Sequence, residues 1–437
     1  MKTNFSLFRM DGWKKLLTGF GSMKDKSQNQ NSIPGFERLV DVHLAALYYM
    51  GGCIKNAVNI PAESMVKAGF EVEGDDGKLY SSFQELNGTE QMKQALIWTR
   101  LYGGALVVLD VEGGGDWALP WYPEKGGKIR SLRVYPRTRV ELGRMETVQM
   151  PESMYFEDFE RFIIRKSDGN TFEVHASRCL VFKSTTKVDQ AEPGWLDYER
   201  YWGLSSIYEG LEDARNFGMT GQGTSHLMQE CSVGKYKLSN LEQLVAESDY
   251  KSIENRLEAM DMQKSVINGV FLGQDEDYTR ENVTFAGVPE VWDRQMMAVS
   301  GSYRIPVTKL FGRSAAGMNA TGEGDEDNYT DYVSGLQEAQ LLPPLRKLMT
   351  LLNYETKTIP KEGNKAPKLV IDFNPLSKKD QLKEAQIRET MSRADRNYVE
   401  AGILNQEDII KNRFQGGYKI DTTVDEDYQF TLDEPEE

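Results

Sequence analysis

The feature of this sequence that most restricts its fold is a run of small residues, Gly312–Gly324, between two helical patterns. Apolar residues recur at helical spacing from Pro289 to Pro306, and they do so again over 326–352. The run between them is rich in Gly, Ala and small polar residues and cannot form regular structure for long. The sequence therefore predicts two helices joined by a loop. Residues 313–325 have an extended length of about 43–47 Å, so the loop can reach about 20 Å out and back.

Other long helices are predicted on both sides of this loop. Ser205 or Ser206 can N-cap a helix that continues to Glu230 and would be about 39 Å long. Three glycines interrupt that helix and predict a bend or the close approach of a neighbour. Pro343-Pro344 should kink the helix that follows the loop, because two backbone donors are missing there. Residues 376–413 are also predicted to be helical. The three glycines in the helix that continues to Glu230 are Gly218, Gly221 and Gly223.

The N-terminal half has a different pattern. A helix is expected from Val40 to Val58, with Pro61 ending or kinking it, and a second helix over 89–102. Short β-branched and aromatic runs separated by turn residues predict a mixed α/β region over 60–185, and Leu369–Phe373 predicts a further strand. The strands expected in that region include Ala105–Val111, Ser131–Tyr135, Val140–Leu142, Arg161–Arg165, Phe172–Val174 and Cys179–Phe182. A strand at Val233–Leu238, a helix at Leu241–Met260 and a strand at Val266–Leu272 suggest a small inserted α/β module. The fold class is therefore α+β.

Composition excludes several classes of protein. The chain has 437 residues and a formal net charge of −15, which argues against coating nucleic acid by bulk charge. Its 3 cysteines lie far apart, which argues against a disulfide framework or a cysteine-based zinc site. The apolar stretches are much shorter than the ~20 residues that span a bilayer. Residues 1–30 lack the apolar core of a secretory signal, so none is expected.

The motifs of catalysis and cofactor binding are incomplete. Gly312 and Gly317 have the spacing of a phosphate-binding loop, but Met318-Asn319 follows instead of the required Lys-Ser or Lys-Thr. His175-Ala176-Ser177 is a single His-x-Ser element, whereas phosphoesterases that use such elements need two of them. The acidic clusters at 275–277 and 325–327 do not fit an EF-hand. We therefore expect no metal, no cofactor and no catalytic residues.

The basic stretch Lys125–Arg144 leaves two interpretations open. Its Lys and Arg side chains could contact phosphate groups. Alternatively they belong to a solvated strand face or a subunit interface, since Arg133 and Tyr135 alternate with Leu132 and Val134.

One segment carries a specific resemblance. From Ser302 the chain reads SYRIPVTKLFG and continues as RSAAGMNATGEGDEDNYTDYVSGLQEAQLLPPLRKLM. This resembles the portal proteins of tailed bacteriophages, in the branch long described as phage-associated proteins of unknown function. The shared features are a helix ending in Ile305-Pro306, the Leu310-Phe311-Gly312 step, the loop Asn319–Glu323 and a Tyr-bearing helix that reaches Leu342–Leu345. The resemblance extends more loosely over about 35–375.

The resemblance implies a ring of about twelve subunits at one capsid vertex, in the virion and, during assembly, in the host cytoplasm. Double-stranded DNA would be packaged and ejected through its central channel. The expected partners are the packaging terminase, the major capsid protein and a head–tail adaptor, with no membrane. In the terms of that family, the chain divides into a flexible arm (1–34), an α/β wing region (35–203), a descending stem helix (204–232), a small α/β clip (233–288), an ascending stem helix (289–311), a channel loop (312–325), a kinked wing helix and strand (326–375), crown helices (376–420) and an acidic tail (421–437).

Two sets of candidate functional residues follow from this resemblance. Residues that would contact DNA in the channel are Arg304, Lys309, Arg313, Ser314, Asn319 and Thr321. For the three cations, helix-end capping or intersubunit ion pairs are equally open. Residues of the clip that would dock a partner, in an expected exposed turn, are Asp275, Glu276 and Asp277.

Two other functions stay open at this point. Some relatives in the same phage branch are anti-defence phosphoesterases, so the chain could act on cyclic oligonucleotides. It could also be a monomeric minor capsid or head-assembly factor.

Overall fold

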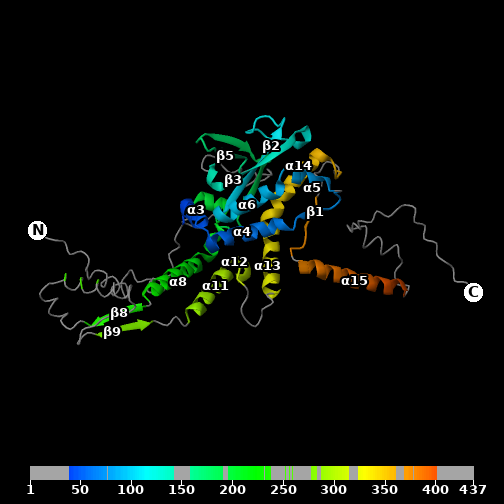
Figure 1. Ribbon diagram of the computed structural model, residues 1–437. Helices are drawn as coiled ribbons and strands as arrows, with labels where there is room; N and C mark the ends of the chain where they lie inside the picture. Colours follow the sequence, from blue (N-terminus) through cyan, green and yellow to red (C-terminus); the bar gives the residue numbers. More distant parts are fainter. Residues whose placement is uncertain are drawn as a thin grey trace, which may run out of the picture. The chain divides into compact units, whose positions relative to one another are not determined.

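The computed structural model describes a large part of the chain (Figure 1). The described residues are 39–75, 77–141, 158–189, 195–230, 232–237, 251, 255, 258, 277–282, 287–313, 323–360, 369–376 and 378–400. The chain forms two units, Met1–Gly51 and Gly52–Glu437. In the first unit the structure describes the helix α3 (Asp41–Tyr49). The arm 1–34 and the acidic tail 421–437 lie outside the described residues.

The prediction that Pro61 ends or kinks a helix beginning near Val40 was wrong about where that helix ends. The chain breaks earlier, at Gly51 and Gly52, which have φ of 82° and 69°. Helix α4 (Gly52–Lys67) then continues through Pro61. Pro61 leaves the carbonyl of Ala57 without its usual helical donor. The buried Arg100 supplies a replacement, because its Nη2 donates to the Ala57 oxygen at 3.0 Å.

The α/β region contains short strands, as predicted, and the structure pairs them in antiparallel sheets. One has the strand order β3-β2-β7, from Lys128–Pro136, Gly104–Glu112 and Cys179–Lys183. Another has the order β4-β5-β6, from Val140–Glu141, Arg161–Arg165 and Thr171–His175. A third joins β1 (Phe70–Val72) to β10 (Ile371–Phe373), so that Phe70 pairs with Phe373 and Val72 pairs with Ile371. Helix α6 (Gly88–Tyr102) matches the predicted helix, whereas α5 (Lys78–Glu85) and α7 (Asp197–Trp202) were not predicted.

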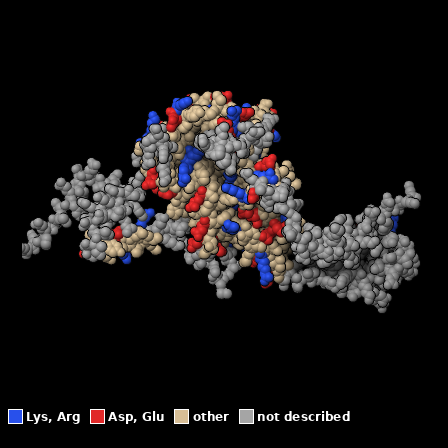
Figure 2. All heavy atoms as spheres, turned by 180° about the vertical axis from the view of Figure 1, so that it is seen from behind, with Lys and Arg blue, Asp and Glu red and all other residues tan. Residues whose placement is uncertain are grey.

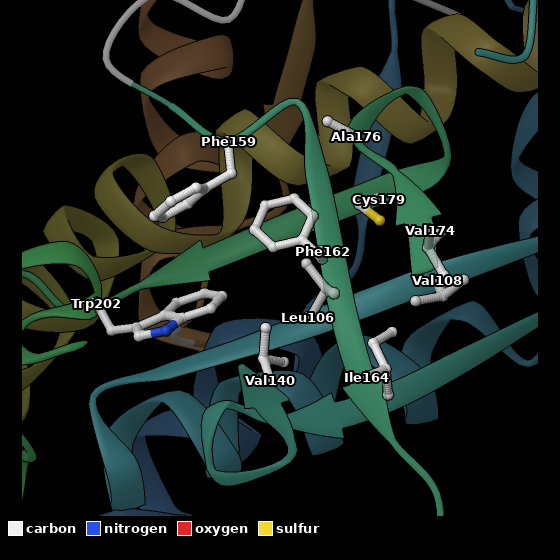
Figure 3. Close-up of a cluster of buried hydrophobic side chains, with 10 residues drawn as sticks. All are labelled: Leu106, Val108, Val140, Phe159, Phe162, Ile164, Val174, Ala176, Cys179 and Trp202. Carbon is white, nitrogen blue, oxygen red and sulfur yellow. The ribbon is translucent and has the colours of Figure 1, made fainter. Parts of the chain in front are cut away.

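A hydrophobic cluster joins the first two sheets (Figure 3). The side chains of Leu106 and Val108 from β2, Phe162 and Ile164 from β5, and Trp202 at the end of α7 are all buried in it. Gly104 lies directly against Trp202, and a Cβ there would come within 2.3 Å of the indole ring. The absence of a side chain at this position therefore allows α7 to pack on the sheet.

The helical part after Gly203 follows the predicted order. A 3₁₀ turn (Ser206–Gly210) leads into α8 (Leu211–Glu230), and the Ser205 hydroxyl accepts from the Ile207 amide at 3.2 Å as an N-cap. Helix α11 (Val288–Tyr303) packs against α8. At this contact the ring centroids of Phe217 and Trp292 are 4.9 Å apart. Of the three glycines in α8, Gly221 faces the Trp292 ring, whereas Gly218 and Gly223 face open space.

Between α8 and α11 the structure describes the strands β8 (Ser232–Lys237) and β9 (Asp277–Asn282), which pair antiparallel. The strand β8 was predicted and β9 was not. The helix predicted at Leu241–Met260 lies largely outside the described residues, and the strand predicted at Val266–Leu272 lies wholly outside them.

The helix after the small-residue run has three parts. Helix α13 (Glu323–Leu336) passes into a π-helical turn (Gln337–Leu341), and α14 (Leu342–Thr356) follows. Pro343 and Pro344 lie in the first turn of α14, where missing donors cost least. The π-helical turn shifts the backbone register immediately before them. The expected interruption is therefore present, and it takes the form of one wide turn.

The last described element is α15 (Lys378–Glu400), the first part of the helix predicted over 376–413. Residues beyond it lie outside the described part of the chain. No helix among the described residues has both the length and the apolar character needed to cross a membrane.

Candidate functional site

The candidate site is the loop junction, which we define as residues 304–313 and 323–332 on either side of the segment 314–322. Helix α11 ends at Tyr303, and Arg304 takes the left-handed conformation at its C-terminus with φ of 55°. Pro306 then begins the short helix α12 (Val307–Leu310). The junction is therefore a helix end, a sharp turn and one helical turn in immediate succession.

Buried contacts hold this junction against the rest of its unit. Tyr303 is fully buried, and its hydroxyl donates to the Ile207 carbonyl at 3.1 Å. Leu310 is also buried, and its carbonyl accepts from the Asn56 side chain at 2.9 Å. Tyr303 and Leu310, which precede the segment 314–322, are thus fixed by packing on the turn before α8 and on α4.

An ion pair joins the two sides of the junction. Lys309 Nζ lies 2.8 Å from Glu326 Oε1 and 4.9 Å from the centre of the Tyr329 ring. The Tyr329 hydroxyl is 2.9 Å from the Ser64 hydroxyl, and burial raises the pKa of Tyr329 to about 12. Tyr329 is therefore neutral at physiological pH and serves as a hydrogen-bonding anchor between α13 and α4.

Each of the three predicted DNA-contacting cations has a partner in its own chain. Lys309 pairs with Glu326, and Arg313 pairs with Asp293 of α11. Arg304 lies over the ring of Tyr332 at 5.7 Å, at the C-terminal end of α11 where a positive charge is favourable. These contacts agree with the helix-end and ion-pair interpretation, except that the ion pairs lie within one chain. Contact with DNA stays a prediction.

The other predicted site residues give less information. Ser314, Asn319 and Thr321 lie outside the described residues, as do Asp275 and Glu276. The expectation that Asp277 lies in an exposed turn was wrong. Asp277 is the first residue of β9 and pairs with Lys237 of β8, because the chain there continues a two-stranded ladder. Partner docking by these three acids stays a prediction.

The His-x-Ser element has a structural use. Nδ1 of the buried His175 accepts from the Ser177 amide at 3.1 Å and lies 3.0 Å from the Ser177 hydroxyl. That hydroxyl accepts in turn from the Trp121 amide at 2.9 Å. Burial lowers the pKa of His175, and the carboxylate of Glu160 partly opposes this effect. The pair therefore closes a turn between β6 and β7.

Two cations of the basic stretch fit its structural interpretation. Arg133 pairs with Asp110 on the neighbouring strand at 2.9 Å. Arg137 is buried, donates to the carbonyl of Tyr102 and stacks on the ring of Tyr198. On the face drawn in Figure 2, Lys and Arg side chains are interspersed with Asp and Glu across the described residues.

Sequence reasoning missed the half-buried Lys347 of α14, whose Nζ donates to the carbonyls of Ala176 and Cys179 at 2.9 and 2.8 Å. Ser64, the partner of Tyr329, was also missed. Both contacts join residues more than 160 positions apart, so no local pattern could have shown them. Among the described residues, no group of three His, Cys, Asp or Glu could hold a metal ion.

The comparison with protein families decides the assignment. The family model described as phage portal protein matches residues 42–397. The chain belongs to the phage portal protein family. The match includes both helices of the loop junction and the α/β region, so the family resemblance extends well beyond the segment after Ser302.

Individual proteins similar to this portal family member agree with its fold. A chain from the virion of a native gene transfer agent particle covers 86% of this chain and 94% of its own length, with a TM-score of 0.50 at 12% identity. This likeness supports the α+β portal fold. An uncharacterized protein of Haemophilus influenzae is 24% identical and covers 95% of this chain and 92% of its own length.

A relative with another kind of name also matches this chain. The anti-CBASS protein Acb1 of Sphingomonas paeninsulae is 29% identical over 353 residues, which make up 77% of this chain and 55% of the relative. The chain therefore spans just over half the length of that protein.

Proposed function

We propose that this protein forms the ring-shaped portal at one vertex of a phage capsid, through which DNA is packaged and later ejected. The observation that carries this proposal is the family match over residues 42–397. The similarity to a chain of a virion particle supports a place in the virion. In this proposal the ring has about twelve subunits and docks the packaging motor first and the head–tail adaptor later.

The loop junction supports a specific role within that ring. The segment 314–322 begins and ends at positions held together by the Lys309–Glu326 ion pair and by the anchors of Leu310 and Tyr329. We propose that this segment reaches into the central channel. The three cations predicted to contact DNA, Arg304, Lys309 and Arg313, are already paired with an acid or an aromatic ring, so they would hold passing phosphates weakly. Weak contact suits a passage that DNA has to move through in both directions.

The enzyme alternative has less support. It rests on the name of relatives of which this chain covers just over half. In this chain the His-x-Ser element closes a turn, where His175 and Ser177 accept hydrogen bonds from the backbone amides of Ser177 and Trp121 and contact each other. We propose that the protein is a structural component without a reaction of its own.

Electron microscopy of the purified full chain tests the proposal directly. Negatively stained particles should show rings with a central hole, and class averages should give the number of subunits. Particles that stay monomeric over a range of protein and salt concentrations would refute the portal proposal and favour a monomeric assembly factor. Cleavage of cyclic oligonucleotides by the same preparation would instead support the enzyme.

A further inference from the structure

A polar cavity lies beside the loop junction. It has a volume of about 160 Å³ and is lined by residues of α4, α12 and α13 and by Pro375-Leu376 after β10. Its polar side chains are Ser64, Lys67, Lys309, Glu326, Tyr329 and Thr330. Lys67 is exposed, so the cavity reaches the surface of the protein. Four of these residues, Lys309, Glu326, Tyr329 and Thr330, also belong to the loop junction.

The cavity has more hydrogen-bond donors than acceptors. Among the described residues, the Lys67 ammonium group and the Thr330 hydroxyl have no hydrogen-bond or ion-pair partner. Lys309 gives one of its three donors to Glu326. Ser64 and Tyr329 share one hydrogen bond, which leaves one O–H of the pair to donate elsewhere. Two ammonium groups face one carboxylate, so the cavity has a net charge of about +1 and suits an anionic oxygen ligand.

We propose that the cavity receives the carboxylate of an Asp or Glu side chain from a second copy of this chain. This inference rests on the proposed ring. The chain carries 67 acidic and 52 basic residues, so two copies brought together repel each other. This repulsion is reduced where acidic side chains of one copy lie opposite basic side chains of the next. The unpaired Lys67 beside the Lys309–Glu326 pair provides such a cation-rich position.

The alternative anionic ligand, a phosphate of duplex DNA, fits this cavity less well. A duplex is stiff and carries its phosphates on its own outer surface, with a persistence length of about 50 nm. It cannot bend into a recess of this size, whereas a carboxylate on a flexible side chain can enter. A phosphate held by two lysines would also resist the movement of DNA.

Cross-linking of the full-length protein tests the contact itself. Unlabelled and ¹⁵N-labelled protein are assembled together and treated with a carbodiimide, which joins an ammonium group to a carboxylate in direct contact. Peptide mass spectrometry should find Lys67 linked to an Asp or Glu of the other isotope. Lys78, an exposed lysine at the start of α5, serves as the control and should not form such a link. Links of Lys67 within one chain only would overturn the inference.

Assembly of charge-reversed variants tests whether the contact contributes to the ring. Lys67→Glu should raise the subunit concentration needed for half-assembly by about tenfold, because two acids would then face each other. Lys78→Glu changes the net charge equally and should assemble like wild type. Thr330→Val removes one donor without changing charge and should have a smaller effect in the same direction. Circular dichroism melting curves verify that each variant is folded.

The outcomes separate this inference from the proposed function. Suppose that the wild-type protein and Lys67→Glu form rings equally well and that Lys67 forms no cross-link to another copy. This result would overturn the inference and leave the portal proposal intact. Wild-type protein that never forms rings would overturn the portal proposal, and the inference with it. If Lys67→Glu assembled normally but bound DNA less tightly than wild type, the cavity would be a phosphate site and the inference would be wrong.

Discussion

Replacement of Gly210 by Ala should test how tightly the turn before α8 packs on α11. A Cβ at this position would lie 2.7, 2.8 and 2.9 Å from three atoms of the Tyr303 ring. Ordinary contacts between carbon atoms are about 3.5–4.0 Å, so the closest ring atom would have to move by at least ~0.8 Å. Tyr303 is fully buried, and its hydroxyl is bonded to the Ile207 carbonyl, which restricts that movement. We expect Gly210→Ala to lower the free energy of unfolding by about 1–3 kcal/mol.

The control is a Gly→Ala substitution at Gly218, in the helix that follows the turn. Gly218 lies within α8, and a Cβ there would meet no atom within 4 Å. Gly218→Ala should therefore raise the free energy of unfolding by about 0.5–1 kcal/mol, because alanine favours helix more than glycine does.

Urea unfolding followed by circular dichroism measures both variants, with wild type and variants held in the same oligomeric state. Tyr303→Phe frees the ring from the Ile207 carbonyl, so Gly210→Ala should cost less in that background. If Gly210→Ala were as stable as wild type, the close packing of this turn on α11 would be refuted.

Two further predictions concern buried groups of the α/β region. Burial raises the pKa of the Cys179 thiol to about 12, so iodoacetamide at pH 8 should label it only after unfolding, as peptide mass spectrometry can show. Labelling of the native protein at the rate of a free thiol would contradict this. Burial lowers the pKa of His175 in the folded protein, so on acidification this side chain takes up a proton in the unfolded chain before it does in the folded one. The free energy of unfolding should therefore fall as the pH drops below about 6.5. In His175→Asn the amide oxygen can still accept from the Ser177 amide. Urea unfolding should therefore show that this variant loses less stability than wild type between pH 7 and pH 5. Equal losses in the two proteins would argue against His175 as the source.

Much of the fold could be predicted from local patterns. The strand at Arg161–Arg165 and the helix at 88–102 have clear periodicity and turn residues at both ends, and the structure contains both. Helix α5 was missed because it has only two buried apolar residues, Leu79 and Phe83. Its start is marked by Asp75, whose carboxylate accepts from the Leu79 amide, and this capping signal was overlooked.

The wrong prediction at Pro61 has a different cause. A proline in a helix leaves a carbonyl without a donor, and the local sequence shows only that loss. The compensating Arg100 lies on another helix, so its role depends on tertiary packing.

The same limit applies to the candidate site. The sequence identified Lys309 and Arg313 as cations beside the small-residue run, but it could not show that Glu326 and Asp293 face them. Burial of Tyr329 against Ser64 likewise depends on α4 and α13 coming together. Sequence reasoning therefore located the junction and could not establish which of its charges are neutralised.

The π-helical turn at 337–341 has a consequence for how members of this family can differ. Such a turn accommodates one residue more than an α-helix of the same length. Loss of a single residue from Gln337–Leu341 would therefore convert this wide turn to regular α-helix and leave α13 and α14 on nearly the same faces. Tyr329 and Tyr332 would keep their positions beside Lys309 and Arg304. Loss of one residue between Tyr332 and Gln337, in regular α-helix, would instead rotate these rings by about 100° relative to α14, so a deletion in the π-helical turn would be tolerated far more readily than one just before it.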